Sequence, residues 1–293
     1  MKILLTGASG FVGRVLLRRL RAAGHEVVGL CHAQRGDASL VPCDLAQPLT
    51  LGGTFDVIVH AAGLSPAQTS SALAFKHANV DSMEQLLAWA RAGHARRMIF
   101  LSSVSVYGDI RADCIDEMTP IVHPDDYGLT KWFAERLLED SGIEGLVLRM
   151  PGVFGIRAER PWLARVVERC LRGEDVTIYS PAFVSNNYLY VEDLAAFIAQ
   201  MLDAAWRERT LLLGLAQGVT IREAVELVRR TVGSSSRIVE KESAMQPFTL
   251  DIRRALAAGF APHDFTSMIG GCLYGGGGST PDALSTAIDE VAA

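Results

Sequence analysis

A tyrosine and a lysine four positions apart, Tyr127 and Lys131, are the side chains in this sequence best suited to acid–base chemistry. They open an apolar-periodic stretch through Leu138 that predicts a helix, and residues four apart share one face of a helix. On that face the ammonium group of Lys131 can lower the pKa of the Tyr127 phenol. Ser103 follows the apolar run 98–101, and its hydroxyl can hold a substrate oxygen. Together the three side chains predict an acid–base site for a carbonyl or an alcohol.

A glycine-rich turn near the N-terminus predicts a binding site for the pyrophosphate of a nucleotide. The turn follows the apolar run 3–5 and precedes a helical pattern. Gly7 permits the tight turn, Gly10 lets the backbone approach the phosphates, and Gly13 lets the helix pack against the strand. The start of the helix adds unpaired N–H groups and the positive end of the helix dipole. The residues predicted to hold a cofactor here are Gly7, Ser9, Gly10, Phe11, Val12 and Gly13.

Apolar runs that alternate with helical patterns predict an α/β fold with these residues at the ends of parallel strands. Beyond the first strand, further strands are predicted at 26–30, 40–43, 55–59, 98–101 and 145–149. After residue 150 the alternation loosens, which predicts a small lobe interleaved with the end of the core. The expected domains are a dinucleotide-binding core at 1–150 with 186–217 returning to it, a substrate-binding lobe at 151–185 and 218–270, and a flexible linker and tail at 275–293.

The end of the second strand bears on the choice of cofactor. An acid there would bind the adenosine ribose hydroxyls and favour NAD, but the sequence has Cys31 and His32 instead. Arg35 lies just beyond and Arg14 follows the last glycine, so either could hold a 2′-phosphate. NADP is therefore favoured over NAD, although both arginines could also be solvated surface charges. Asp44 could accept a hydrogen bond from the adenine amino group or could cap the next turn.

The composition of the 293-residue chain is that of a globular protein and argues against several classes of partner. Apolar residues make up 49% and charged residues 21%, and the net charge is −5 without a basic run, so neither nucleic acid nor a membrane surface is expected. No apolar stretch reaches the roughly 18 residues of a membrane span, and the chain starts on a predicted strand rather than a signal peptide. The five cysteines are scattered without metal-ligand spacing, so we expect no metal and free thiols in a reducing cytoplasm.

Taken together, these motifs resemble the extended short-chain dehydrogenase/reductase family, of the NAD-dependent epimerase/dehydratase type. The similarity covers roughly residues 1–265 in the order and spacing of that family, and it is specific for the family but not for a substrate. The matching motifs are Thr6-Gly7-x-x-Gly10-x-x-Gly13, Asp44-Leu45, His60-Ala61-Ala62-Gly63, Asn79-Val80, Ser102-Ser103-x-x-Val106-Tyr107-Gly108, Tyr127-x-x-x-Lys131, Val153-Phe154-Gly155 and Tyr190-Val191-Glu192-Asp193-Leu194.

The resemblance implies a Rossmann-type doubly wound parallel sheet of seven strands with a small C-terminal substrate-binding lobe. It implies Tyr127 as the acid/base, Lys131 as its partner and ribose ligand, Ser103 as the donor to the substrate oxygen, and Asn79 as support for the proton relay. We also expect a homodimer. Besides the glycine turn, Tyr127 and Lys131, the expected cofactor-binding residues are His32, Arg35, Asp44, Leu45, Ala61, Ala62, Gly63, Pro151 and Val153. The expected substrate-binding residues are Ser65, Ser103, Ser105, Tyr127, Phe154 and Arg157.

Departures from the family pattern bear on the reaction. The two residues after Ser103 are not the acids that the family's dehydratases carry, so elimination of water is not expected. Gly152 and Asn186 stand where UDP-sugar epimerases have an Asn and an Arg that hold the pyrophosphate, which weakens the prediction of a nucleotide-sugar substrate. Arg157 and Arg160 could hold an anion by another route or could be surface charges.

The leading hypothesis is therefore an NAD(P)-dependent oxidoreductase that moves a hydride between nicotinamide and a small-molecule carbonyl/alcohol substrate. The alternative is a nucleotide-sugar 4-epimerase with tightly bound NAD. A third possibility, a non-catalytic nucleotide sensor, is disfavoured because a sensor does not need an acid–base tyrosine.

Overall fold

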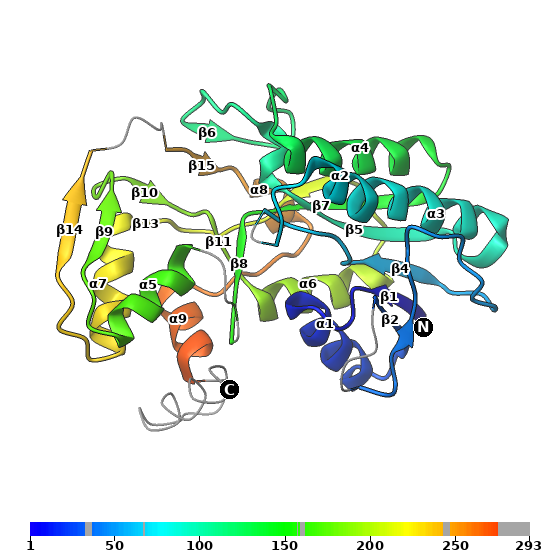
Figure 1. Cartoon of the computed structure of the whole chain (residues 1–293), viewed down its shortest axis with the longest axis horizontal. Coiled ribbons are helices and arrows are strands. Elements are labelled where there is room, and N and C mark those ends of the chain that lie inside the picture. The colour runs from blue at the N-terminus through cyan, green and yellow to red at the C-terminus, as the bar shows by residue number, and fades with distance from the viewer. Residues whose placement is uncertain (33–36, 67, 157, 159–161, 243–246, 275–293) are drawn as a thin grey trace. The chain divides into compact units, whose positions relative to one another are not determined.

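The computed structural model of the chain describes residues 1–32, 37–66, 68–156, 158, 162–242 and 247–274 (Figure 1). The predicted linker and tail at 275–293, together with Arg35, Arg157 and Arg160, lie outside these residues. The chain divides into two compact units. The first consists of Met1–Asp109, Glu117–Met150 and Leu194–Leu212, and the second of Ile110–Asp116, Pro151–Asp193 and the described residues from Leu213 onward.

The first unit contains a seven-stranded sheet in which every neighbouring pair of strands is parallel. This confirms the predicted Rossmann-type doubly wound sheet. In spatial order the strands are β12 (Thr210–Leu212), β7 (Glu144–Met150), β5 (Arg97–Ser103), β4 (Val57–His60), β1 (Lys2–Thr6), β2 (Glu26–Cys31) and β3 (Val41–Pro42).

The central strands contain continuous apolar runs because helices cover both faces of the sheet. Ile3, Leu4 and Leu5 are all fully buried, as a doubly covered parallel strand requires. Helices lie on both faces of the sheet in Figure 1. They are α1 (Phe11–Ala22) and α6 (Val191–Asp203) on the first face, and α2 (Ala72–Phe75), α3 (Ser82–Trp89) and α4 (Asp126–Asp140) on the second.

The order of the strands places a switch point between β1 and β4, which are neighbours although β2 and β3 separate them in sequence. Thr6 and His60, the last residues of these two strands, are register partners. Ligands of doubly wound sheets bind outside the carboxyl ends of the strands at such a point. The glycine turn after β1 and the small residues after β4 therefore start from the edge where a ligand is expected.

In the part of the chain that the structure describes, the second unit consists of short strand pairs and four helices. Its α7 (Ile221–Thr231) begins with a capping box between Thr220 and Glu223. The other helices are α5 (Trp162–Leu171), α8 (Arg253–Ala257) and α9 (Phe265–Tyr274). The strand pairs are β8 (Gly152–Phe154) with β11 (Tyr188–Tyr190), β9 (Val176–Tyr179) with β14 (Ile238–Lys241), β10 (Val184–Ser185) with β13 (Val219–Thr220), and β6 (Cys114–Ile115) with β15 (Thr249–Leu250).

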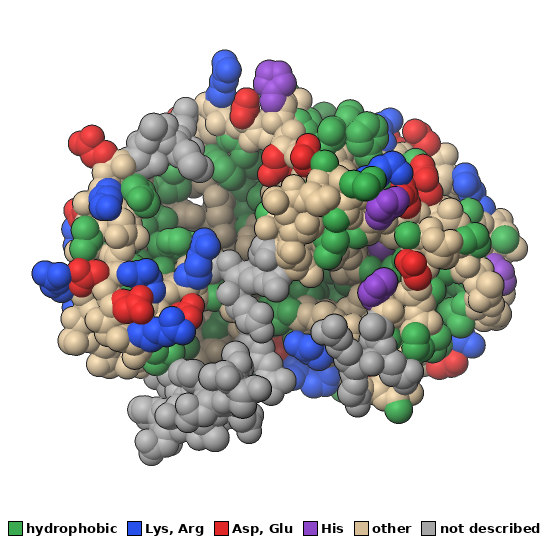
Figure 2. All heavy atoms as spheres, viewed as in Figure 1, with side chains coloured by type: hydrophobic (Ala, Val, Ile, Leu, Met, Phe, Trp, Pro, Cys, Tyr) green, Lys and Arg blue, Asp and Glu red, His purple; other side chains and the backbone are tan. Residues whose placement is uncertain are grey.

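Charged side chains of both signs are interspersed on the face of the molecule shown in Figure 2. Some of them form exposed ion pairs, such as Arg237 with Asp175. Within the described part of the chain, no helix combines the length and the apolar character needed to cross a membrane.

Candidate active site

The glycine turn joins β1 to α1 and leaves the start of α1 open. Gly7 has a left-handed φ of 66°, and a Cβ there would lie 2.7 Å from the backbone nitrogen of Ala62. A Cβ at Gly13 would clash with the carbonyl oxygen of Gly7, so the helix and the turn meet through bare backbone. No side chain caps α1, and no acid lies in its first turn. The Gly10 N–H donates to the Gly7 carbonyl oxygen at 2.9 Å, and the following N–H groups at this helix end can bind a phosphate, so the turn fits the pyrophosphate of a dinucleotide.

The residues expected around the adenosine end are only partly brought together. Cys31 ends β2 and is buried, while His32 after it is exposed. The guanidinium group of Arg14 donates to the carbonyl oxygen of Ser9 at 2.9 Å. Asp44 accepts a hydrogen bond from the backbone nitrogen of Ala46 at 3.1 Å. It therefore caps the turn that follows it, which is one of the two roles expected from the sequence.

Three hydroxyl groups meet where β5 ends and α4 begins. The Ser103 hydroxyl donates to the Ser105 hydroxyl at 3.1 Å, and it lies close enough to the Tyr127 phenol to act on the pKa of that group. Asp125 caps α4 by accepting from the backbone nitrogen of Gly128 at 2.7 Å. Any Cβ at Gly128 would clash with the carbonyl oxygen of Ser105, so this helix start packs directly on the turn η3 (Val104–Tyr107). The predicted hydroxyl residues therefore form one cluster.

Lys131 lies one helical turn after Tyr127 and is buried. Its ammonium group donates to the carbonyl oxygen of Leu101 at 2.8 Å and lies 4.5 Å from the centroid of the Phe100 ring. Burial lowers the pKa of Lys131 to about 8, although the carboxylate of Glu135 acts in the opposite direction. At neutral pH the ammonium group therefore remains mostly charged.

The structure corrects the expected effect of Lys131 on Tyr127. Burial raises the pKa of the Tyr127 phenol above its ordinary value, and the hydrogen bond with Ser103 offsets this only in part. The sequence predicted a lowered pKa because of the nearby ammonium group. In the folded chain desolvation is the dominant effect on the phenol, and the charge of Asp125 raises its pKa as well.

Asn79 ties the loop after β4 to α4. It lies in the π-helical segment η1 (Lys76–Asp81), and its side-chain oxygen accepts from the backbone nitrogen of Leu64 at 3.0 Å. Its amide nitrogen donates to the Thr130 hydroxyl at 3.1 Å. A Cβ at Gly63 would lie 2.6 Å from the Asn79 oxygen and 3.6 Å from the Lys131 nitrogen. The loop predicted to lie under a flat cofactor is thus fixed close to Lys131.

A buried ion pair beside this site was not predicted from the sequence. Glu135 on α4 and Arg149 on β7 are both buried, with their closest atoms 2.7 Å apart. Two signals for it were available: Glu135 follows Lys131 by four residues, and Arg149 is a charge within an apolar strand. A charge in a buried strand requires a buried partner.

The predicted residues of the second unit lie in and next to β8. Phe154 is buried and packs its ring 5.9 Å from that of Tyr188. Asn186, at the position of the missing Arg, is fully used by the backbone of its own unit. Its amide nitrogen donates to the carbonyl oxygens of Leu215 and Leu250 at 3.2 and 2.8 Å, and its oxygen accepts from the Leu250 nitrogen at 2.8 Å. Asn186 therefore links separate backbone segments of the second unit through hydrogen bonds.

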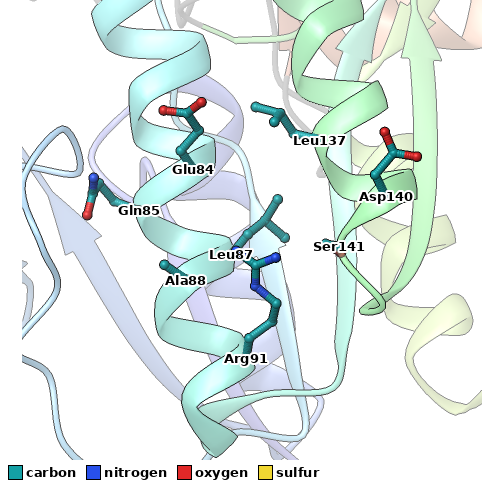
Figure 3. Close-up of a pocket in the computed structure, with 8 residues that line it drawn as sticks. All are labelled: Glu84, Gln85, Leu87, Ala88, Arg91, Leu137, Asp140 and Ser141. Carbon is teal, nitrogen blue, oxygen red and sulfur yellow. The ribbon is translucent and has the colours of Figure 1, made fainter.

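A groove of about 390 Å³ runs between α3 and α4 (Figure 3). None of the predicted site residues lines it. The lining residues are Glu84, Gln85, Leu87, Ala88, Arg91, Leu137, Asp140 and Ser141. This groove is therefore separate from the cluster around Tyr127.

Comparison with known proteins identifies the family of this chain. Residues 3–214 match the NAD dependent epimerase/dehydratase family, and the chain belongs to that family. It is 23% identical to a putative UDP-glucose 4-epimerase of Methanocaldococcus jannaschii, over 89% of this chain and 93% of the relative. It is 26% identical to a D-erythronate dehydrogenase of Cupriavidus necator, over 89% of this chain and 94% of the relative.

Solved structures show the same fold. A UDP-glucose 4-epimerase of Thermus thermophilus in complex with NAD superimposes with a TM-score of 0.73 at 21% identity, covering 92% of this chain and 98% of that one. Proteins named as UDP-sugar 4-epimerases and decarboxylases recur among the relatives. The family is therefore established, and it contains enzymes of more than one reaction type.

Proposed function

We propose that this chain is an NAD(P)-dependent oxidoreductase that moves a hydride between nicotinamide and a carbonyl/alcohol substrate. The cluster of the Ser103, Ser105 and Tyr127 hydroxyls carries this proposal. It lies in the same compact unit as the open glycine turn, and Lys131 follows one helical turn later. A bound nicotinamide cofactor would supply or accept the hydride.

The protein side chains supply the proton and hold the reacting oxygen. Because burial raises the pKa of Tyr127, its phenol is protonated at neutral pH and can donate to the carbonyl oxygen during reduction. Ser103 donates a hydrogen bond to the same oxygen. Lys131, charged at neutral pH, binds the cofactor ribose hydroxyls, and Asn79 fixes the loop at Gly63 against which the cofactor lies.

We propose the second unit as the substrate-binding lobe, with Pro151 and Val153 beside the cofactor and Phe154 near the substrate. Asn186 supports a substrate without a nucleotide handle. Its amide is already used by Leu215 and Leu250, and it is neutral where a UDP-sugar would need a cation. An anion that is buried without a partner is costly, so a UDP-sugar should bind weakly.

A nucleotide-sugar 4-epimerase is the second candidate, and the names of the relatives favour it. In that reaction the same tyrosine would take the proton from a sugar hydroxyl and return it after hydride transfer. Such an enzyme regenerates its cofactor in every cycle and retains it tightly. The two candidates thus share the chemistry at Tyr127 and differ in the handling of substrate and cofactor.

Two measurements on purified protein separate the candidates. The oxidoreductase predicts a cofactor that exchanges with solution and no micromolar binding of UDP or dTDP in isothermal titration calorimetry. Protein that retains NAD through purification and binds UDP with micromolar affinity would instead establish the epimerase. Loss of that UDP binding in Arg157→Ala or Arg160→Ala would locate the pyrophosphate site.

A further inference from the structure

The Glu135 carboxylate is the centre of a buried hydrogen-bond network behind the hydroxyl cluster. It accepts from the Ser102 hydroxyl at 2.5 Å. Arg149 donates to it from two nitrogens, Nε at 3.1 Å and Nη2 at 2.7 Å. Taking a carboxylate and a guanidinium out of water is costly unless their remaining hydrogen-bonding capacity is satisfied, and here much of it is.

This network reaches both sides of Ser103. Ser102 immediately precedes Ser103 on β5 and is the register partner of Arg149 on β7. Arg149 also donates from Nη1 to the Tyr107 hydroxyl at 3.0 Å. Tyr107 is fully buried and ends the turn η3, which starts directly after Ser103 and contains Ser105. The backbone on either side of the hydroxyl cluster is therefore linked to one carboxylate on α4.

The same carboxylate acts on the charge of Lys131, one helical turn earlier on α4. Glu135 raises the pKa of Lys131 against the effect of burial. The other titratable group that interacts with this ammonium group is His60 at the end of β4. Burial lowers the pKa of His60 to about 3, so its ring is neutral and contributes no competing charge. Arg149 is paired with Glu135 itself.

We propose that Glu135 is a positioning residue. Its carboxylate holds the end of β5 with Ser103, and the turn η3 with Ser105, against the helix that carries Tyr127 and Lys131. The proposal rests on the proposed function for the roles of those four residues. Glu135 itself acts through them and contacts neither substrate nor cofactor. A purely structural ion pair would stabilise the fold without affecting the environment of the Tyr127 phenol or the charge of Lys131.

Replacing the whole ion pair distinguishes a positioning role of Glu135 from a purely structural one. In Glu135→Met/Arg149→Met, apolar side chains of similar volume replace both charges, a change that is often neutral or stabilising for a fold. The matched control is Arg136→Met/Glu139→Met, which removes an exposed ion pair from the same helix. Ser102→Ala provides a milder test, because it removes one hydrogen bond to Glu135 and leaves the ion pair in place.

The readout is nuclear magnetic resonance of labelled lysine and tyrosine, which requires no substrate. The sequence has four lysines (Lys2, Lys76, Lys131 and Lys241), so Lys131→Met assigns the signal of Lys131. We expect the pKa of Lys131 to fall by roughly one pH unit in Glu135→Met/Arg149→Met. The ring carbon that bears the Tyr127 hydroxyl should change its chemical shift, and Ser102→Ala should produce a smaller change of the same kind.

A Lys131 pKa and a Tyr127 signal that match those of the control variant would overturn the proposal. If Glu135→Met/Arg149→Met does not fold, Ser102→Ala alone tests the proposal. An unchanged chemical shift of Tyr127 in that variant would then overturn it. Failure of the proposed function is distinguishable, because it would appear as retained turnover in Tyr127→Phe while these spectroscopic shifts remained.

Discussion

Lys131→Met should make the protein more stable while it removes the proposed ribose contact. Burial shifts the pKa of Lys131 from 10.5 to about 8. At about 1.4 kcal/mol for each pH unit, keeping this ammonium group charged costs the folded state about 3 kcal/mol. Methionine keeps most of the apolar stem and has no charge to bury. It leaves the Leu101 carbonyl without its donor, which costs about 1 kcal/mol, so the net gain is about 2 kcal/mol.

The pH dependence of this gain tests its cause. A base whose pKa is lowered by folding destabilises the folded state fully below its folded pKa. This effect disappears as the pH rises toward the unfolded value. The stability difference between Lys131→Met and the wild type should therefore be constant below about pH 8 and shrink between pH 8 and 10.5. Urea denaturation across this range measures it. A variant that is no more stable at pH 7, or a difference that does not change with pH, would refute the reasoning.

Two further predictions concern the cofactor. Gly13→Ala should destabilise the fold by about 1–3 kcal/mol and abolish cofactor binding, because its Cβ clashes with the Gly7 carbonyl oxygen. Gly10→Ala, whose Cβ would lie 3.2 Å from the same oxygen, should affect cofactor binding more than stability, and equal loss of stability in both variants would contradict this. NADP(H) should bind at least as well as NAD(H) in calorimetry, since Cys31 stands where NAD enzymes have an acid. Cys31→Asp should shift the ratio of the two dissociation constants in favour of NAD(H). An unchanged ratio would show that the residue at the end of β2 does not select the cofactor.

Much of the fold was predictable because its signals are local. Continuous apolar runs and the glycine turn define the first β–α unit, and Thr220 with Glu223 marks the start of α7. Helix α9 was missed because Gly270 and Gly271 oppose helix formation. The structure shows why a glycine is needed at 271: a Cβ there would lie 2.5 Å from the Tyr190 hydroxyl. That requirement comes from a residue 81 positions away, so local propensity does not reveal it.

The candidate site was predictable in its residue types but not in its electrostatics. The four-residue spacing put Tyr127 and Lys131 on one helix, and the order of the strands put Ser103 beside them. The direction in which the pKa of Tyr127 shifts depends on how deeply the phenol is buried, and the spacing does not encode burial. The partner of Arg149 likewise became clear only once β7 and α4 were placed side by side.

The proton transfer assigned to Tyr127 is tested most directly by Tyr127→Phe, which keeps the ring and removes only the hydroxyl. Turnover would be measured on a carbonyl substrate found by screening with NADH and NADPH, and cofactor affinity by calorimetry. We predict that kcat falls at least about a hundredfold, the usual contribution of a general acid, while the cofactor dissociation constant is nearly unchanged. Near-normal turnover in Tyr127→Phe would contradict the account.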